Sequence, residues 1–296
     1  MRILVIGGTG MLGHKLWQAY RERFETWVTV RSGFHEYESY GLFDSKHMVG
    51  GVDVFDFGTV ERAFAVVRPD AVINCIGIIK QLPSAQDPII SLTINSLFPH
   101  RLAALCQAVG ARLIHISTDC VFSGHKGMYR ETDIPDAEDL YGRTKLLGEV
   151  SGPGVLTLRT SIIGRELKTA NGLVEWFLSH REGPVRGFTQ AIYSGITTQS
   201  FAKIIADVLL SYPLLTGLYQ VSSDPISKYN LLCLLRDMFG RQIEIEPCPD
   251  PQINRSLDSS RFRGATGFVP LPWAEMVETM ASDSTPYDEW RNQDGS

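Results

Sequence analysis

The sequence predicts an α/β fold, a Rossmann-type doubly wound parallel sheet with a smaller C-terminal α/β lobe. Short apolar runs bounded by turn residues, typical of buried parallel strands, recur at 2–6, 26–30, 71–76, 112–117 and 155–159. Helical patterns lie between them, near 11–23, 59–67, 91–109 and 140–150. A glycine-rich segment follows the first run directly. Strands that alternate with helices over such a length indicate a parallel sheet covered by helices.

The helix near 91–109 has the clearest amphipathic spacing. Its apolar residues recur at helical intervals, and they are Leu97, Leu102, Leu105, Cys106 and Val109. Gly110 follows as a C-cap, where a left-handed conformation favours glycine.

After about residue 160 the rhythm changes. Helical segments near 171–182, 198–211, 227–239 and 272–281 alternate with short strand-like pieces over 218–221 and 243–245. We therefore expect a dinucleotide-binding domain over 1–160, to which a segment of about 190–222 returns, and a second lobe over 161–296. The polar tail after Ser282 is expected to be loosely held.

Composition excludes several classes of protein. The chain has 296 residues, 44% of them hydrophobic, and a formal charge of −5, which disfavours a protein that coats nucleic acid. We see no secretory signal and no apolar stretch near the roughly 18 residues of a membrane helix. The five cysteines show no CxxC pattern, and no His/Cys spacing indicates a metal. We expect a cytoplasmic protein with reduced thiols and no metal, nucleic-acid or membrane partner.

Three glycines, Gly7, Gly10 and Gly13, form a GxxGxxG pattern directly after the first strand. Such a turn is tight, its backbone approaches a pyrophosphate, and the next helix points its positive end at the phosphates. A βα turn without a ligand is the alternative. We predict a dinucleotide site, with cofactor contacts from Gly7, Thr9, Gly10, Met11, Leu12 and Gly13.

The end of the second strand indicates which dinucleotide is bound. NAD-binding folds place an acid there, to hold the ribose hydroxyl. Here Arg31 and Ser32 follow Val30, and an arginine can pair with a 2′-phosphate. We therefore predict NADP(H) rather than NAD(H), the alternative being a solvated arginine.

Two further segments are candidates for the cofactor. Asp53 and Val54 end a short apolar piece, where the carboxylate is expected to accept a hydrogen bond from adenine or else to cap a helix or turn. The run Cys75, Ile76 and Gly77 closes the strand over 71–76 at its carboxyl end, where doubly wound sheets bind ligands.

A tyrosine and a lysine, Tyr141 and Lys145, are four residues apart and so project from one face of a helix. A free phenol has a pKa near 10, and a nearby ammonium lowers it toward neutral pH. Thr118, at the end of the strand over 112–117, can donate a second hydrogen bond to a carbonyl oxygen. In this order, after a dinucleotide turn, these residues predict hydride transfer to or from a carbonyl.

The chain resembles the extended short-chain dehydrogenase/reductases, and among them the dTDP-4-dehydrorhamnose reductase group of sugar-nucleotide reductases. The resemblance rests on the segments 117–124 (STDCVFSG) and 141–149 (YGRTKLLGE), with weaker likeness at 195–198 and 255–258. It implies a Thr118, Tyr141 and Lys145 triad, Asn95 in a proton relay, and a sugar-nucleotide pocket from 160–195 and 225–260. Cys120 stands where the group has an aromatic residue; we interpret it as a packing residue rather than a nucleophile.

The substrate implied by the resemblance is a nucleotide-activated 4-keto-6-deoxysugar, reduced with NADPH. Thr118 and Asp119 are expected to contact it, and Arg186 and Arg255, both in loop-like contexts, to bind its phosphates. A homodimer is expected from the family. Two alternatives stay open: a sugar-nucleotide epimerase or dehydratase, and a non-catalytic NADP-binding regulatory subunit.

Overall fold

The computed structural model describes residues 1–294, and side chains as far as residue 291. The chain forms two compact units, which we call the first and the second unit. The first comprises 1–117, 139–158 and 208–218, and the second comprises 118–138, 159–207 and the residues from 219 onward. These bounds differ from the expected ones, since 118–138 joins the second unit and the returning segment is 208–218. Which unit binds which ligand stays a prediction.

A seven-stranded sheet has the order β11-β6-β5-β4-β1-β2-β3. Its strands are β1 (Arg2–Ile6), β2 (Glu25–Thr29), β3 (Met48–Val49), β4 (Ala71–Asn74), β5 (Arg112–Thr118), β6 (Val155–Thr160) and β11 (Gly217–Gln220). The pairs β1–β2, β1–β4, β2–β3 and β4–β5 are parallel. The predicted fold class is thus confirmed. Strand order reverses at β1, and such sheets bind ligands beside the carboxyl ends of strands at that point.

The helical segments of the first unit are α1 (Met11–Tyr20), α2 (Phe57–Val67), α3 (Pro88–Ser91), the π-helix η5 (Leu92–Leu97), α4 (Phe98–Val109) and α5 (Leu140–Leu147). Of these, α2 and α4 bury an apolar stripe in one core cluster with the sheet. Phe64 of α2 and Phe98 and Leu102 of α4 share one core cluster with Leu4 and Val72 of the sheet. Burial of such side chains contributes roughly 1.5–3 kcal/mol each, so the stripe fixes these helices on the strands.

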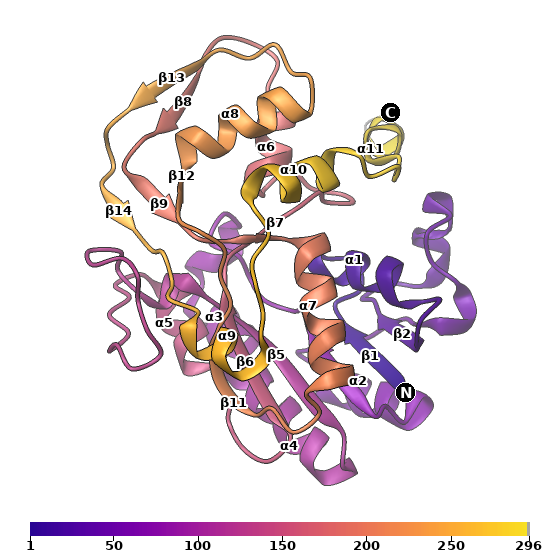
Figure 1. Ribbon diagram of the computed structural model, residues 1–296. Helices are drawn as coiled ribbons and strands as arrows, with labels where there is room; N and C mark the ends of the chain where they lie inside the picture. Colours follow the sequence, from indigo (N-terminus) through magenta and orange to yellow (C-terminus); the bar gives the residue numbers. More distant parts are fainter. Residues whose placement is uncertain (295–296) are drawn as a thin grey trace. The chain divides into compact units, whose positions relative to one another are not determined.

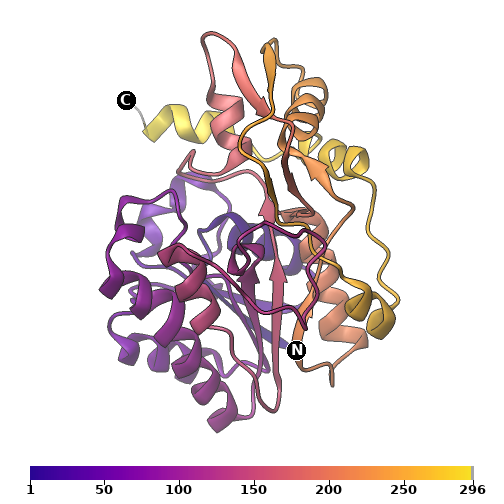
Figure 2. The ribbon, with the colours of Figure 1, turned by 90° about the vertical axis from the view of Figure 1, so that its left-hand side faces the viewer.

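The segments α3, η5 and α4 form one helix, Pro88–Val109, beside the sheet (Figure 2). By length and composition this helix is apolar enough to cross a membrane, so the expectation that no such stretch exists was wrong. Core helices pass the same test, and Ile94, Phe98 and Leu102 of this helix do belong to the core cluster.

Small sheets and helices build the second unit (Figure 1). β8 (Val185–Phe188) pairs with β13 (Ile245–Cys248), β9 (Ala191–Tyr193) lies between β12 (Ile226–Ser227) and β14 (Ile253–Asn254), and β7 (Ile162–Ile163) pairs with β10 (Ile196–Thr197). The helices beginning there are α6 (Leu173–Ser179), α7 (Thr198–Ser211), α8 (Lys228–Met238), α9 (Ser260–Thr266), α10 (Trp273–Ala281) and α11 (Tyr287–Asp294). Short 3-10 helices of the first unit cover Phe34–Glu36, Glu38–Tyr40, Ser45–His47 and Pro83–Gln86, and one in the second unit covers Asp119–Val121.

The segment after Ser282 is not the loose tail that its polarity predicted. It forms α11, in which Tyr287 and Trp290 are buried, at 1% and 6% exposure. Two aromatic side chains at helical spacing bury enough apolar area to hold a polar helix in place.

Candidate functional site

The glycine turn has the geometry that a phosphate-binding turn requires. Gly7 has a φ of +90°, which favours glycine, and its N–H donates to Thr29 Oγ1 at 3.1 Å. A Cβ on Gly13 would lie 2.0 Å from the Gly7 carbonyl oxygen, so only glycine lets α1 begin this close to the strand. Gly10 is the N-cap of α1 and makes no side-chain cap. Thr9, Gly10 and Met11 are accessible there, while Leu12 packs in the core.

Arg31 and Ser32 follow β2 at its carboxyl end. Val30 is buried, Arg31 is exposed and Ser32 is half-buried. The guanidinium therefore has room for an anionic ligand.

Asp53 forms a turn between β3 and α2. Its Oδ1 accepts the Phe55 N–H at 3.0 Å, and Asp56 rather than Asp53 caps α2. Val54 is buried in the core. Of the two uses expected for Asp53, the structure shows the turn, and the contact with adenine stays a prediction.

Asn95 connects the end of β4 to α5. Its Oδ1 accepts the Ile78 N–H at 2.9 Å, and its Nδ2 donates to the Ile78 carbonyl and to Thr144 Oγ1. Gly77 is exposed, and a Cβ there would lie 3.4 Å from Asn95 Oδ1 and 3.8 Å from Lys145 Nζ. The segment of Cys75, Ile76 and Gly77 thus passes beside both side chains, with Cys75 and Ile76 half-buried.

Helix α5 carries Tyr141 and Lys145 one turn apart. Asp139 fixes its start by accepting the Gly142 N–H at 2.7 Å. Lys145 is 5% exposed, and its Nζ donates to the Ile116 carbonyl on β5 at 2.8 Å. Burial lowers the Lys145 pKa to about 8, although the negative charge of Glu149 acts to raise it. Glu149 Oε1 accepts a hydrogen bond from Ser117 Oγ at 2.7 Å.

The sequence did not single out His115 of β5, which lies beside this lysine. Its Nδ1 is 3.1 Å from Asn74 Nδ2, and the ring is fully buried. Burial and the charge of Lys145 hold the His115 pKa well below its usual range, so the imidazole is neutral. A histidine within the apolar run 112–117 was the signal that could have identified it.

Thr118 and Asp119 belong to the second unit, where β5 ends. Thr118 Oγ1 donates to Asp119 Oδ1 at 3.1 Å and accepts the Cys120 N–H at 3.1 Å. Burial raises the pKa of Asp119, against the lowering effect of Arg255 and Lys228. Burial, with the Asp119 charge, also raises the Cys120 pKa to about 12, which disfavours the nucleophile interpretation of this thiol.

The cations of the second unit differ from expectation in one respect. Arg255 lies in a loop after β14 as predicted, and its Nε donates to the Phe122 carbonyl at 2.9 Å. Arg186 is not in a loop but on the edge-exposed β8, where its Nη2 donates to Cys248 Sγ at 2.8 Å. Lys228, at the start of α8, acts on Asp119 electrostatically together with Arg255. The sequence predicted a loop at Arg186 because a proline and a glycine lie close to it.

Tyr193 on β9 is a second residue that sequence reasoning missed. It is 8% exposed, and its hydroxyl has no hydrogen-bond partner in the described chain. Burial, together with the negative charge of Asp119, raises the pKa of Tyr193 well above its usual value. The phenol therefore stays protonated and can donate a hydrogen bond. Only the pairing of β9 with β12 and β14 brings it into the field of Asp119.

Among described residues, no group of three His, Cys, Asp or Glu side chains has the arrangement of a metal site. The absence of a metal remains a prediction for the whole chain.

Relatives of two kinds resemble this chain. Methionine adenosyltransferase 2 subunit beta of Bos taurus is 26% identical over 285 residues, which cover 88% of this chain and 81% of that protein. A dTDP-4-dehydrorhamnose reductase of Streptomyces griseus is 34% identical over 149 residues, 50% of this chain and 43% of the relative.

Solved structures share the fold. A hypothetical dTDP-4-dehydrorhamnose reductase from Sulfolobus tokodaii has a TM-score of 0.76 and 28% identity, covering 92% of this chain and 98% of that one. The Bacillus anthracis dTDP-4-dehydrorhamnose reductase in complex with NADP has a TM-score of 0.77 at 22% identity, covering 94% and 98%. The family model described as the RmlD substrate binding domain matches residues 1–285, so the predicted resemblance is confirmed and the chain belongs to the RmlD substrate binding domain family.

Proposed function

We propose that this protein reduces a nucleotide-activated 4-keto-6-deoxysugar with NADPH. The observation that carries the proposal is the state of Lys145: a buried ammonium, held by the Ile116 carbonyl, one helical turn from Tyr141 and beside the exposed Gly77. A lysine without a functional role is seldom buried in this way, because burying its charged group costs free energy.

The glycine turn of the first unit fits a dinucleotide. A Cβ on Gly13 would collide with the Gly7 carbonyl, and α1 starts without a side-chain cap, so its N–H groups and dipole favour a pyrophosphate. Arg31 would hold the 2′-phosphate and Gly77 would let the backbone approach the nicotinamide end. When bound, NADPH supplies the hydride for the substrate carbon.

The chain's own residues supply the proton and hold the carbonyl. Tyr141 donates the proton to the oxygen, and the Lys145 ammonium stabilises the phenolate that remains. Thr118 donates a second hydrogen bond to the same oxygen. Asn95 relays a proton from solvent through water, and Asp119, Arg255 and Lys228 bind the nucleotide sugar. Arg186, which is exposed on β8, is a further candidate for the phosphates.

The first test follows NADPH absorbance against a panel of nucleotide-linked 4-keto-6-deoxysugars. Tyr141→Phe is expected to lose at least about 100-fold in kcat, because it removes the general acid, with little change in NADPH affinity. Tyr212→Phe makes the same change elsewhere in the first unit and should keep full activity. Turnover by Tyr141→Phe at the wild-type rate would refute the role of the phenol.

The second test concerns the choice of cofactor. Arg31→Ala should weaken NADPH binding by about 10-fold or more and leave NADH binding within about twofold, because a charge-assisted bidentate pair is lost only with the 2′-phosphate. Arg62→Ala removes an exposed arginine of α2 and is the matched control. Equal losses for both cofactors would contradict the assignment.

A second candidate function is supported by the relatives named methionine adenosyltransferase 2 subunit beta, which align with 88% of this chain at 26% identity. In that case the chain is a non-catalytic, NADP-binding subunit of a methionine adenosyltransferase. Co-elution with such an enzyme, together with no turnover of any keto sugar, would favour it. Co-purified NAD with no net oxidation would instead indicate an epimerase.

A further inference from the structure

The hydroxyl of Tyr193 is a buried hydrogen-bond donor that the chain itself leaves unpaired. The side chain, on β9, is 8% exposed, and the hydroxyl has no hydrogen-bond partner among the described residues. An unpaired buried hydroxyl costs free energy, so folded proteins hold few of them without a reason. A group from outside the chain, such as a water or a ligand, is the ordinary way to complete the bond.

The ring of Tyr193 is held in place by its neighbours. It lies against Trp273 of α10, with 5.6 Å between the ring centroids, and a Cβ on Gly195 would come 2.8 Å from its Cε2 atom. The Trp273 indole is fixed in turn, because its Nε1 donates to the Asp224 carbonyl at 2.8 Å. Packing of the ring therefore sets where the hydroxyl lies.

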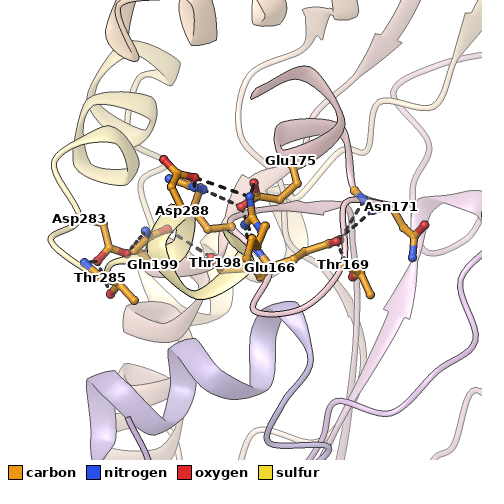
Figure 3. A network of polar contacts seen from close by, with 12 residues as sticks. Glu166, Thr169, Asn171, Glu175, Thr198, Gln199, Asp283, Thr285 and Asp288 are labelled. Atoms are coloured by element: carbon orange, nitrogen blue, oxygen red, sulfur yellow. Dashed lines mark hydrogen bonds and ion pairs between the residues drawn. The ribbon is translucent and has the colours of Figure 1, made fainter. Parts of the chain in front are cut away.

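Two buried carboxylates of the same unit show the usual alternative (Figure 3). The Glu166 carboxylate accepts a hydrogen bond from Thr169 Oγ1 at 2.6 Å. The Glu175 carboxylate accepts one from Arg165 Nε at 2.6 Å and pairs with Arg291. In these cases the chain supplies partners from its own side chains, which it does not do for the phenol of β9.

Hydrogen bonds connect β9 with the turn that follows β5. The Arg255 N–H donates to the carbonyl of Ile192, the residue before Tyr193, at 2.9 Å. The Arg255 Nε donates to the Phe122 carbonyl, also at 2.9 Å. Phe122 directly follows the short helix that begins at Asp119. One arginine thus contacts both the strand of Tyr193 and the turn that carries Asp119.

The start of α8 is the third element at this place. Tyr193 pairs with Ile226 across β9 and β12, and Lys228 begins α8 two positions later. The charges of Arg255 and Lys228 act on Asp119. The charge of Asp119 acts in turn on the Tyr193 phenol. A carboxylate, two cations and an unpaired phenol therefore converge just after the carboxyl end of β5, where parallel sheets bind ligands.

The donors and acceptors of this cluster favour one chemical group. The Tyr193 phenol donates and the Asp119 carboxylate accepts, so a group that serves both must accept one hydrogen bond and donate another. A carbonyl or phosphate oxygen has no proton to donate, and a phosphate would also be repelled by the carboxylate. A hydroxyl does both, and a sugar carries several.

We propose that Tyr193 binds a hydroxyl of the sugar in the nucleotide sugar: the phenol donates a hydrogen bond to it, and the hydroxyl donates to the Asp119 carboxylate. The inference rests on the proposed function for the class of ligand. It adds the residue that distinguishes a nucleotide sugar from a bare nucleoside diphosphate. The cations Arg255 and Lys228 lie beside the same carboxylate and suit the adjoining phosphates.

The test is calorimetry of the full chain and of Tyr193→Phe with thymidine diphosphate glucose and uridine diphosphate glucose, and with the two bare diphosphates. Tyr193→Phe removes only the hydroxyl. It should bind the nucleotide sugar about tenfold more weakly, because one hydrogen bond is lost, and the bare diphosphate within about twofold of wild type. Tyr219→Phe, at a half-buried tyrosine whose ring lies 6.1 Å from Phe262, is the control and should bind both as wild type does.

Stability separates a ligand contact from a structural one. In the ligand-free protein, Tyr193→Phe removes a donor that has no partner, so its urea midpoint should equal or exceed that of the wild type. A hydroxyl that binds a buried structural water would behave in the opposite way, because its removal leaves that water without a partner.

Asp119→Asn tests the acceptor, since the amide keeps the size of the side chain and loses the charge. It should also weaken binding of the nucleotide sugar, and in the double variant with Tyr193→Phe the two losses should not add, because both groups bind one hydroxyl. In turnover, Tyr193→Phe should raise KM for the keto sugar about tenfold and leave KM for NADPH within about twofold.

Unchanged affinity of Tyr193→Phe for the nucleotide sugar would overturn the inference, and lower stability with it would assign the hydroxyl to a structural water. Equal weakening for the nucleotide sugar and the bare diphosphate would overturn it too. If the variant binds the nucleotide sugar more weakly but the wild type reduces no keto sugar, the inference holds and the proposed function fails. Turnover by Tyr193→Phe with an unchanged KM would leave the proposed function and refute the inference, and a wild type that binds no nucleotide sugar would refute both.

Discussion

Replacing Lys145 with methionine tests whether this lysine is kept for chemistry at a cost in stability. Methionine has a similar length and no charge, so Lys145→Met fills the same space on α5 while removing the ammonium. The variant should lose catalysis, because the phenol of Tyr141 loses its neighbouring charge. We expect it also to be more stable than the wild-type protein at pH 7.

The magnitude follows from the burial of the side chain. Burial lowers the Lys145 pKa from 10.5 to about 8. At about 1.4 kcal/mol per pH unit, this places the protonated side chain about 3 kcal/mol higher in free energy in the folded chain than in water. Methionine leaves the Ile116 carbonyl without its 2.8 Å donor, at a cost of about 1 kcal/mol. The net expectation is a gain of about 2 kcal/mol in the free energy of unfolding.

The gain depends on pH with a defined sign. Below pH 8 the lysine is protonated in both states, and the wild-type protein carries the whole cost. Between about pH 8 and 10.5 the folded chain has released this proton and the unfolded chain has not, so wild-type stability rises with pH relative to the variant. The advantage of Lys145→Met should therefore shrink and vanish across this window.

Urea unfolding at pH 7 and pH 10, followed by circular dichroism, measures the difference between variant and wild type. Lys203→Met, at an exposed position of α7, is the control and should change stability by less than about 0.5 kcal/mol at both pH values. A variant less stable than wild type at pH 7, or a difference independent of pH, would refute the reasoning.

Two further predictions concern Lys145 and the glycine turn. The kcat/KM for the keto sugar should fall above about pH 8, because Lys145 loses its proton there. An active Lys145→Arg variant should lack that fall, because arginine stays charged. A flat wild-type profile up to pH 10 would contradict this prediction. Gly13→Ala should weaken NADPH binding about tenfold and destabilise the protein by about 1–3 kcal/mol, because its Cβ would lie 2.0 Å from the Gly7 carbonyl oxygen. Gly264→Ala, at a helical glycine with open space around it, is the control, and NADPH titration of both variants decides the matter.

Much of the secondary structure was predictable because its signals are local. The predicted strand at 2–6 and helix at 198–211 match β1 and α7 in their bounds, since apolar periodicity and turn residues act within a few positions. Tyr141 and Lys145 could be paired from their spacing alone, because a helix places such residues on one face. The predicted strand over 71–76 ends earlier, at Asn74, where the Asn74 side chain accepts the Ile76 N–H and turns the chain.

What the sequence determined by itself is therefore the order of strands and helices, the glycine turn and the candidate proton donor with its lysine. What the tertiary structure alone decided is which distant groups meet. It brings Lys228 and Arg255, rather than Arg186, into the field of Asp119, and it places Arg291 on the Glu166 carbonyl, 125 positions earlier in the chain. Periodicity carries no information about such pairs, because they depend on how whole elements pack and on how each buried charge is compensated.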